Sequence, residues 1–88
     1  MKMMLMIVAD SDTDAVMSGL VEAGFRVTQV ASTGGFLRRG NNTLLIGTED
    51  ERVEEAITLV RQTCRQPERE GQRSATIFVM DVEHYQQL

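Results

Sequence analysis

The stretch ASTGGFLRRGNNTLLIG, residues 31–47, joins a glycine-rich connection to an apolar segment, and the rest of the chain is arranged around it. It contains four of the seven glycines, the adjacent Arg38 and Arg39, and the aromatic Phe36. Glycines let the backbone approach a ligand closely, so that successive N–H groups can face an anion, and arginines add phosphate contacts. Gly-Gly and Gly-Asn are also ordinary turn residues. Taken alone, the stretch fits either a long turn or a phosphate-binding loop.

Strand-like segments lie on both sides of this connection. Residues 25–30 begin with alternation, with Phe25 and Val27 on one face and Arg26 and Thr28 on the other. Residues 42–47 are apolar on both faces. These segments predict two neighbouring strands of one sheet.

Along the chain, one helix is predicted before the first of these strands and another after the second. Thr48-Glu49-Asp50-Glu51 has a capping-box pattern that predicts a helix over residues 49–65, which Pro67 ends. Ser11-Asp12-Thr13-Asp14 has the same pattern and predicts a helix over residues 12–23, with Gly24 as its left-handed cap. Apolar runs at residues 2–9 and 75–80 predict the first and last strands.

The order strand, helix, strand, strand, helix, strand predicts a single α+β domain over residues 1–88. Its fold is ferredoxin-like, βαββαβ, a four-stranded antiparallel sheet with both helices on one face. Two helices cover only that face, whereas three of the strands are apolar on both faces. We therefore expect copies of the same chain to bury the second face.

Composition narrows the function classes. Thirteen acidic and nine basic residues give a net charge of −4, which argues against a general nucleic-acid or membrane-surface binder. The single cysteine, Cys64, excludes an internal disulfide, and we expect it to pack in the core. The apolar opening is too short to span a bilayer and lacks a signal-peptide cleavage pattern. We expect a soluble cytoplasmic protein.

Catalysis has little support in the sequence. The sole histidine, His84, has no evident base or ligand partner, and no residues have the spacing of a nucleophile elbow or a metal site. We expect no enzyme activity, no cofactor and no metal. An RNA-recognition module would need aromatics on its central strands, where this chain has Leu44, Leu45 and Ile46. Phe78 is expected in the core, and Arg26 either in solvent or facing a neighbouring subunit.

A specific pattern occurs in two runs of the sequence and at the glycine that follows them. The runs are Phe25-Arg26-Val27-Thr28 and Ala31-Ser32-Thr33-Gly34-Gly35-Phe36-Leu37-Arg38-Arg39-Gly40-Asn41-Asn42-Thr43, and the glycine is Gly47. They resemble the signature of the PII-like cyclic-di-AMP receptors of bacteria. The likeness extends over most of the chain, through Asp10-x-Asp12, Leu20-Val21-x-x-Gly24-Phe25, Asp50-x-x-Val53 and the closing Ala75-Thr76-Ile77-Phe78-Val79-Met80.

This resemblance implies a sensor that forms homotrimers and binds one cyclic dinucleotide in each cleft between neighbours. It implies that Phe36 and Leu37 wall an adenine pocket and that Asn41 and the backbone at Gly47 supply polar contacts. The implied ligand-binding residues are Arg26, Thr28, Gly35, Phe36, Leu37, Asn41, Gly47 and Gln87. The protein target of such a sensor is not identified by these residues.

The chain departs from the family in three places. Asn42 stands where the family usually has threonine, and Asp81 where it usually has proline. Only Arg65 to Ser74 remains of a long glycine-rich loop that in relatives is thought to signal to partners. The alternatives are a PII-like trimer that binds another adenine nucleotide or acts only through protein partners, and a small phosphate-handling enzyme. The enzyme would need a phosphate loop where this chain has Asp10-Ser11-Asp12.

Overall fold

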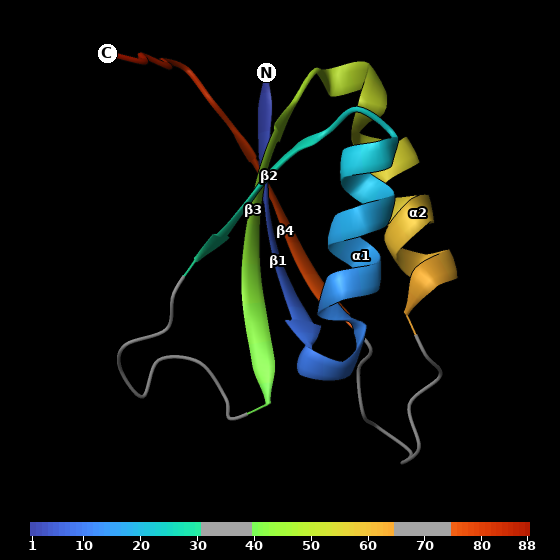
Figure 1. Ribbon diagram of the computed structural model, residues 1–88. Coiled ribbons are helices and arrows are strands. Elements are labelled where there is room, and N and C mark those ends of the chain that lie inside the picture. Colours follow the sequence, from blue (N-terminus) through green and yellow to red (C-terminus); the bar gives the residue numbers. More distant parts are fainter. Residues whose placement is uncertain (31–39, 65–74) are drawn as a thin grey trace.

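A computed structural model of the chain describes residues 1–30, 40–64 and 75–88. Four strands form one antiparallel sheet in the order β2-β3-β1-β4, and both helices lie on the same side of it (Figure 1). The elements are β1 (Lys2–Ala9), α1 (Asp10–Glu22), β2 (Arg26–Val30), β3 (Asn41–Thr48), a 3₁₀ turn η1 (Asp50–Arg52), α2 (Val53–Thr63) and β4 (Ala75–Asp81). The ferredoxin-like α+β fold predicted from the sequence is confirmed.

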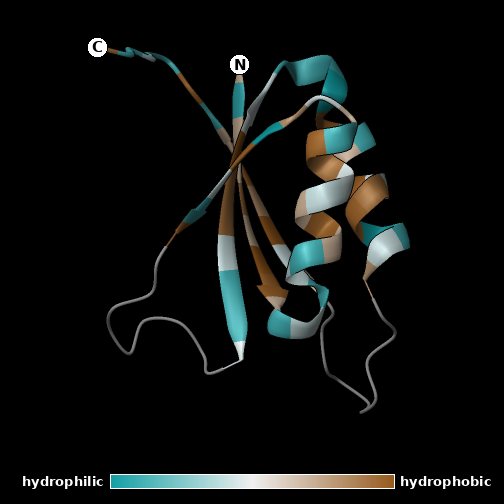
Figure 2. Cartoon of the chain, viewed as in Figure 1, coloured by the Kyte–Doolittle hydropathy of each residue, from teal (hydrophilic) through white to brown (hydrophobic). Residues whose placement is uncertain are grey.

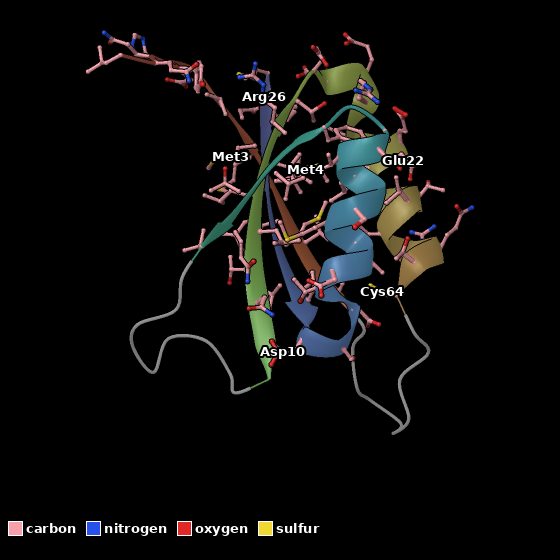
Figure 3. All side chains as sticks on the ribbon, viewed as in Figure 1. Met3, Met4, Asp10, Glu22, Arg26 and Cys64 are labelled. Atoms are coloured by element: carbon pink, nitrogen blue, oxygen red, sulfur yellow. The ribbon has the colours of Figure 1, made fainter. Side chains whose placement is uncertain are left out.

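The core lies between the sheet and the helices. Alternate residues of β1 (Met4, Met6 and Val8) are fully buried on this side, as the two-residue period of a strand requires. Figure 3 shows Met4 pointing toward α1 and Met3 pointing away from it. The buried apolar residues are Met4, Met6, Val8, Val16, Leu20, Phe25, Leu44, Ile46, Ala56 and Val60. Figure 2 shows the matching apolar segments on the strands and on the facing parts of the helices.

Neither α1 nor α2 covers the opposite side of the sheet, and we call it the open face. The strand register arranges its residues in rows across the sheet, because directly paired residues point to the same side. One row is Arg26, Gly47, Met3 and Met80, and the next is Thr28, Leu45, Leu5 and Phe78. Phe78 is 52% exposed. The expectation that Phe78 packs in the core is wrong for the single chain, because its register with Leu5 turns it away from the helices.

The beginning of α1 differs from the predicted capping box. The helix begins at Asp10, directly after β1, and its N-cap Ala9 provides no side-chain hydrogen bond. The Asp10 backbone N–H donates to the Gly40 carbonyl at 2.7 Å, so strand-like pairing continues into the first helical residue and satisfies that donor. The second predicted capping box is also not formed. A 3₁₀ turn begins at Asp50 without a side-chain cap, and α2 begins only at Val53.

The end of α1 matches the prediction. Gly24 has φ +93, and its N–H donates to the Val21 carbonyl at 3.0 Å. The Phe25 N–H donates to the Leu20 carbonyl at 2.9 Å, which completes a Schellman motif. Leu20 and Phe25 are both buried in the core. The motif therefore anchors the chain immediately before β2 and sets where Arg26 begins that strand.

The end of α2 comes earlier than predicted. The helix ends at Thr63, whose hydroxyl donates to the Leu59 carbonyl at 2.7 Å, and the following Cys64 has an extended backbone. Cys64 is half-buried and packs against the core, as expected from the sequence. Burial raises the pKa of its thiol, with a smaller contribution from the Asp12 carboxylate.

Candidate functional site

An open cleft of about 1170 Å³ lies at the end of the sheet where β2 begins and β3 ends. Its walls come from the first residues of the chain, the β3–η1 connection and the tail after β4. Arg26, Thr28, Gly47 and Gln87 line it, so four of the eight residues implied by the resemblance lie together. The volume exceeds the roughly 300–1,000 Å³ typical of small-molecule pockets.

Arg26 and Gly47 are the centre of the cleft on the open face. They are direct partners in the β2–β3 pairing, and Arg26 is exposed. In the part of the chain that the structure describes, the Arg26 guanidinium has no carboxylate or hydrogen-bond partner. Thr28 lies on the same face in the next row, beside the apolar Leu45. A free guanidinium beside a hydroxyl and an apolar side chain suits a phosphate ester with a base attached.

Gly47 leaves the backbone accessible at this point. It is exposed, and it is not among the glycines with positive φ, so its conformation does not require glycine. A Cβ placed on Gly47 would stand 3.6 Å from Cε of Met1, an ordinary contact. The local fold therefore does not require glycine here, and the absent side chain leaves the main chain accessible.

Gln87 reaches the cleft from the tail. The tail leaves the sheet on the side away from the helices (Figure 1). It is fastened at its start, where the Val82 N–H donates to the Met1 carbonyl at 3.1 Å. Farther along, the Tyr85 hydroxyl donates to Oε1 of Gln87 at 3.3 Å. Gln87 is exposed, so its amide is accessible to a ligand.

Asn41 lies apart from these residues. It pairs with Ala9 at the opposite end of β3 from Gly47, a separation of roughly 20 Å along the strand. One chain therefore does not bring Asn41 together with Arg26, Gly47 and Gln87. Three further implied residues, Gly35, Phe36 and Leu37, lie outside the described residues.

The N-terminal amine, Lys2 and Arg52, which also line the cleft, are each paired with a carboxylate. The N-terminal amine lies 3.1 Å from Asp50, and Nε of Arg52 lies 2.9 Å from Glu55. Lys2 donates to Asp81 in a row that points to the helix side of the sheet. This hydrogen bond raises the pKa of Lys2 and lowers the pKa of Asp81.

Lys2 and Arg52 are cleft residues that sequence reasoning missed. No motif marks them, because their place in the cleft follows from strand pairing and from the turn after β3. Asp81 did have a signal, since it stands where the family usually has proline.

A polar network closes the opposite end of the sheet. Nδ2 of Asn42 donates to Asp10 and, at 2.9 Å, to the Thr13 hydroxyl, which itself donates to the Ala9 carbonyl at 3.0 Å. Nε2 of Gln29 donates to Oδ1 of Asn42 at 3.0 Å. These bonds connect β2, β3 and the start of α1, so the asparagine at this position has a structural role.

Residues 1–30, 40–64 and 75–88 contain no group of three His, Cys, Asp or Glu side chains that could hold a metal ion. Within the same ranges, no helix combines the length and apolar character needed to cross a membrane.

Comparisons relate the chain to a protein family and to a solved structure. A family model described as cyclic-di-AMP receptor matches residues 1–72, which include Arg26, Thr28, Asn41 and Gly47. Among solved structures, a functionally unknown protein from Pediococcus pentosaceus ATCC 25745 is similar, with 28% sequence identity and a TM-score of 0.80. The match covers 99% of this chain and 96% of that chain.

Proposed function

Because the chain belongs to the cyclic-di-AMP receptor family, we propose that it is a cytoplasmic, non-enzymatic signalling receptor that binds cyclic-di-AMP between the subunits of a homotrimer. The observation that carries the proposal is the meeting of Arg26, Thr28 and Gly47 in one cleft on the open face. Their chemistry suits a phosphodiester and a sugar, and within the described residues the side chains of Arg26 and Thr28 have no hydrogen bond or ion pair.

Each residue has a distinct role in this proposal. The Arg26 guanidinium binds a phosphodiester oxygen, and the exposed backbone at Gly47 donates or accepts a hydrogen bond beside it. The hydroxyl of Thr28 and the amide of Gln87 supply further polar contacts. Phe36 and Leu37 wall the adenine pocket and Gly35 is a further ligand-binding residue, as the family resemblance implies.

The open face supports the trimer. Its rows place Leu5, Leu45, Phe78 and Met80 side by side, with Phe78 and Met80 exposed in the single chain. A continuous apolar surface of this kind marks an interaction site, and copies of the same chain are the partners expected for a small domain. Asn41, at the far end of β3, then contributes to a cleft other than the one lined by its own Arg26.

Isothermal calorimetry with cyclic-di-AMP, ATP and cyclic-di-GMP tests the ligand, and light scattering at micromolar concentration tests the assembly. We expect a trimer with one cyclic-di-AMP per subunit and no saturable binding of the other two nucleotides. A monomer would overturn the interfacial site. Binding of ATP in place of cyclic-di-AMP would favour the alternative of a PII-like module for another adenine nucleotide.

A further inference from the structure

Arg52 lines the cleft and contacts both the connection between α1 and β2 and the first turn of α2. Its Nη2 donates to the Ala23 carbonyl at 2.8 Å and to Oε1 of Glu55 at 3.0 Å, and its Nε donates to Oε2 of Glu55 at 2.9 Å. Its Cζ lies 4.1 Å from the centre of the Phe25 ring. Arg52 therefore reaches two neighbouring positions of the connection between α1 and β2.

These contacts join two walls of the cleft that are distant in sequence. Ala23 and Phe25 lie directly before Arg26, at the end of the Schellman motif. Arg52 itself lies on η1, just after the end of β3 that carries Gly47. Phe25 is buried, so its ring gives Arg52 a fixed surface to rest on.

We propose that Arg52 is a positioning residue of the ligand site, holding the start of β2 so that Arg26 stands opposite Gly47 in the geometry that binds a phosphodiester. The identity of the ligand rests on the proposed function, whereas the positioning role rests on the contacts of Arg52.

The contacts need the shape of arginine as well as its charge. A planar guanidinium can donate two hydrogen bonds to a carboxylate, donate another to a carbonyl and lie flat on an aromatic ring at the same time. The Glu55 carboxylate fixes the plane from the α2 side, and the hydrogen bond between them raises the pKa of Arg52 and lowers that of Glu55. A lysine at this position keeps the charge but cannot make the same set of contacts.

The experiment is a double-mutant cycle in cyclic-di-AMP affinity, with Arg52→Met, Arg26→Ala and the combined variant. We expect Arg52→Met alone to weaken binding about tenfold, the size of coupling seen between residues of one network. In the Arg26→Ala background, Arg52→Met should change affinity less than about twofold, because it acts through Arg26. Additive losses would overturn the proposal, since they would mean that Arg52 binds the ligand independently.

Two control variants separate positioning from charge and from stability. Arg52→Lys keeps the charge and should lose as much affinity as Arg52→Met; full affinity in Arg52→Lys would contradict the geometric argument. Val60→Ala, a core change on α2 away from the cleft, destabilises the fold and should leave affinity unchanged. An equal loss of affinity in Val60→Ala would assign the effect to general destabilisation.

A ligand-free readout distinguishes failure of this proposal from failure of the proposed function. If the unmodified chain does not bind cyclic-di-AMP, the proposed function fails and the positioning role is judged by amide hydrogen exchange. Exchange at Arg26 to Thr28 should then be faster in Arg52→Met than in Val60→Ala at matched distance from the unfolding midpoint. Equal exchange in the two variants would overturn the role of Arg52.

Discussion

At the residue scale, two glycines near the cleft serve opposite purposes. Gly24 has φ +93, which a residue with a Cβ rarely adopts, whereas Gly47 has an ordinary backbone conformation and an open surface. Substituting each by alanine therefore separates a structural requirement from a requirement for ligand access.

We expect Gly24→Ala to lower the free energy of unfolding by about 1–2 kcal/mol, the cost of a left-handed conformation for a residue with a side chain. We expect Gly47→Ala to leave stability nearly unchanged, because its new methyl group makes only an ordinary contact with Met1. The same Gly47→Ala change should weaken cyclic-di-AMP binding at least tenfold by blocking the backbone. Urea denaturation and calorimetry measure the two effects, and a destabilised Gly47→Ala would refute the assignment.

The Lys2–Asp81 pair predicts how stability changes in acid. The pKa of Asp81 is lowered from its ordinary 3.8, so its contribution is present above that value and is lost as the pH falls through the lower folded pKa. The pKa of Lys2 is raised from 10.5, so its contribution disappears only in strong base. Asp81→Asn should therefore be less stable than the unmodified chain at neutral pH, and the two stabilities should converge below pH 3.8.

Thermal unfolding at a series of pH values checks this prediction. Both side chains are accessible to water, so the difference should be small and should shrink as salt is added. A difference in unfolding temperature between the two proteins that grows in acid would contradict the assigned ion pair.

At the scale of elements, the strands were predictable and the helix beginnings were not. Alternation and apolar runs placed β2, β3 and β4 to within a residue at each end, because burial sets these patterns directly. The second capping box failed because a 3₁₀ turn precedes α2. The first failed because backbone pairing between Asp10 and Gly40 satisfies a donor that a capping side chain would otherwise bind. Such pairing joins residues distant in sequence and leaves no local signal.

The Asn42 network gives a prediction for how the elements hold together. Asn42→Ala removes hydrogen bonds to Asp10, Thr13 and Gln29, and should lower the free energy of unfolding by about 1–3 kcal/mol. Ligand affinity of the folded protein should stay nearly constant, because Asn42 does not line the cleft. Chemical denaturation together with calorimetry measures both quantities. Lost affinity at full stability would show that this end of β3 acts on the ligand.

At the scale of the whole molecule, the candidate site was only partly predictable. The resemblance selected Arg26, Thr28, Gly47 and Gln87, and the fold brings them into one cleft. The sequence does not predict that Lys2 and Arg52 line the cleft, because their position depends on the packing of chain segments that no motif connects. Phe78 was assigned to the core because an apolar strand residue usually packs within its own domain, whereas here it lies on the open face.

Phe78→Glu tests whether that face is an interface between copies. The side chain is already exposed in the single chain, so the monomer should fold while the trimer dissociates. Val21→Glu is the matched control, because Val21 is 58% exposed on α1, away from the open face. Light scattering should show a smaller particle for Phe78→Glu alone. A trimer that survives Phe78→Glu would place the interface elsewhere.

The alternation of β1 also distributes methionines between the two sides of the sheet. Met4 and Met6 are buried in the core, while Met3 and Met80 are direct partners on the open face and Met1 lies against Gly47. Methyl groups of methionine give sharp, separate signals in nuclear magnetic resonance, so isotope labelling of this one residue type would follow three processes in one spectrum. The signals of Met1 and Met3 should respond to ligand, because both residues line the cleft. The signal of Met80 should respond to subunit association, and those of Met4 and Met6 only to unfolding.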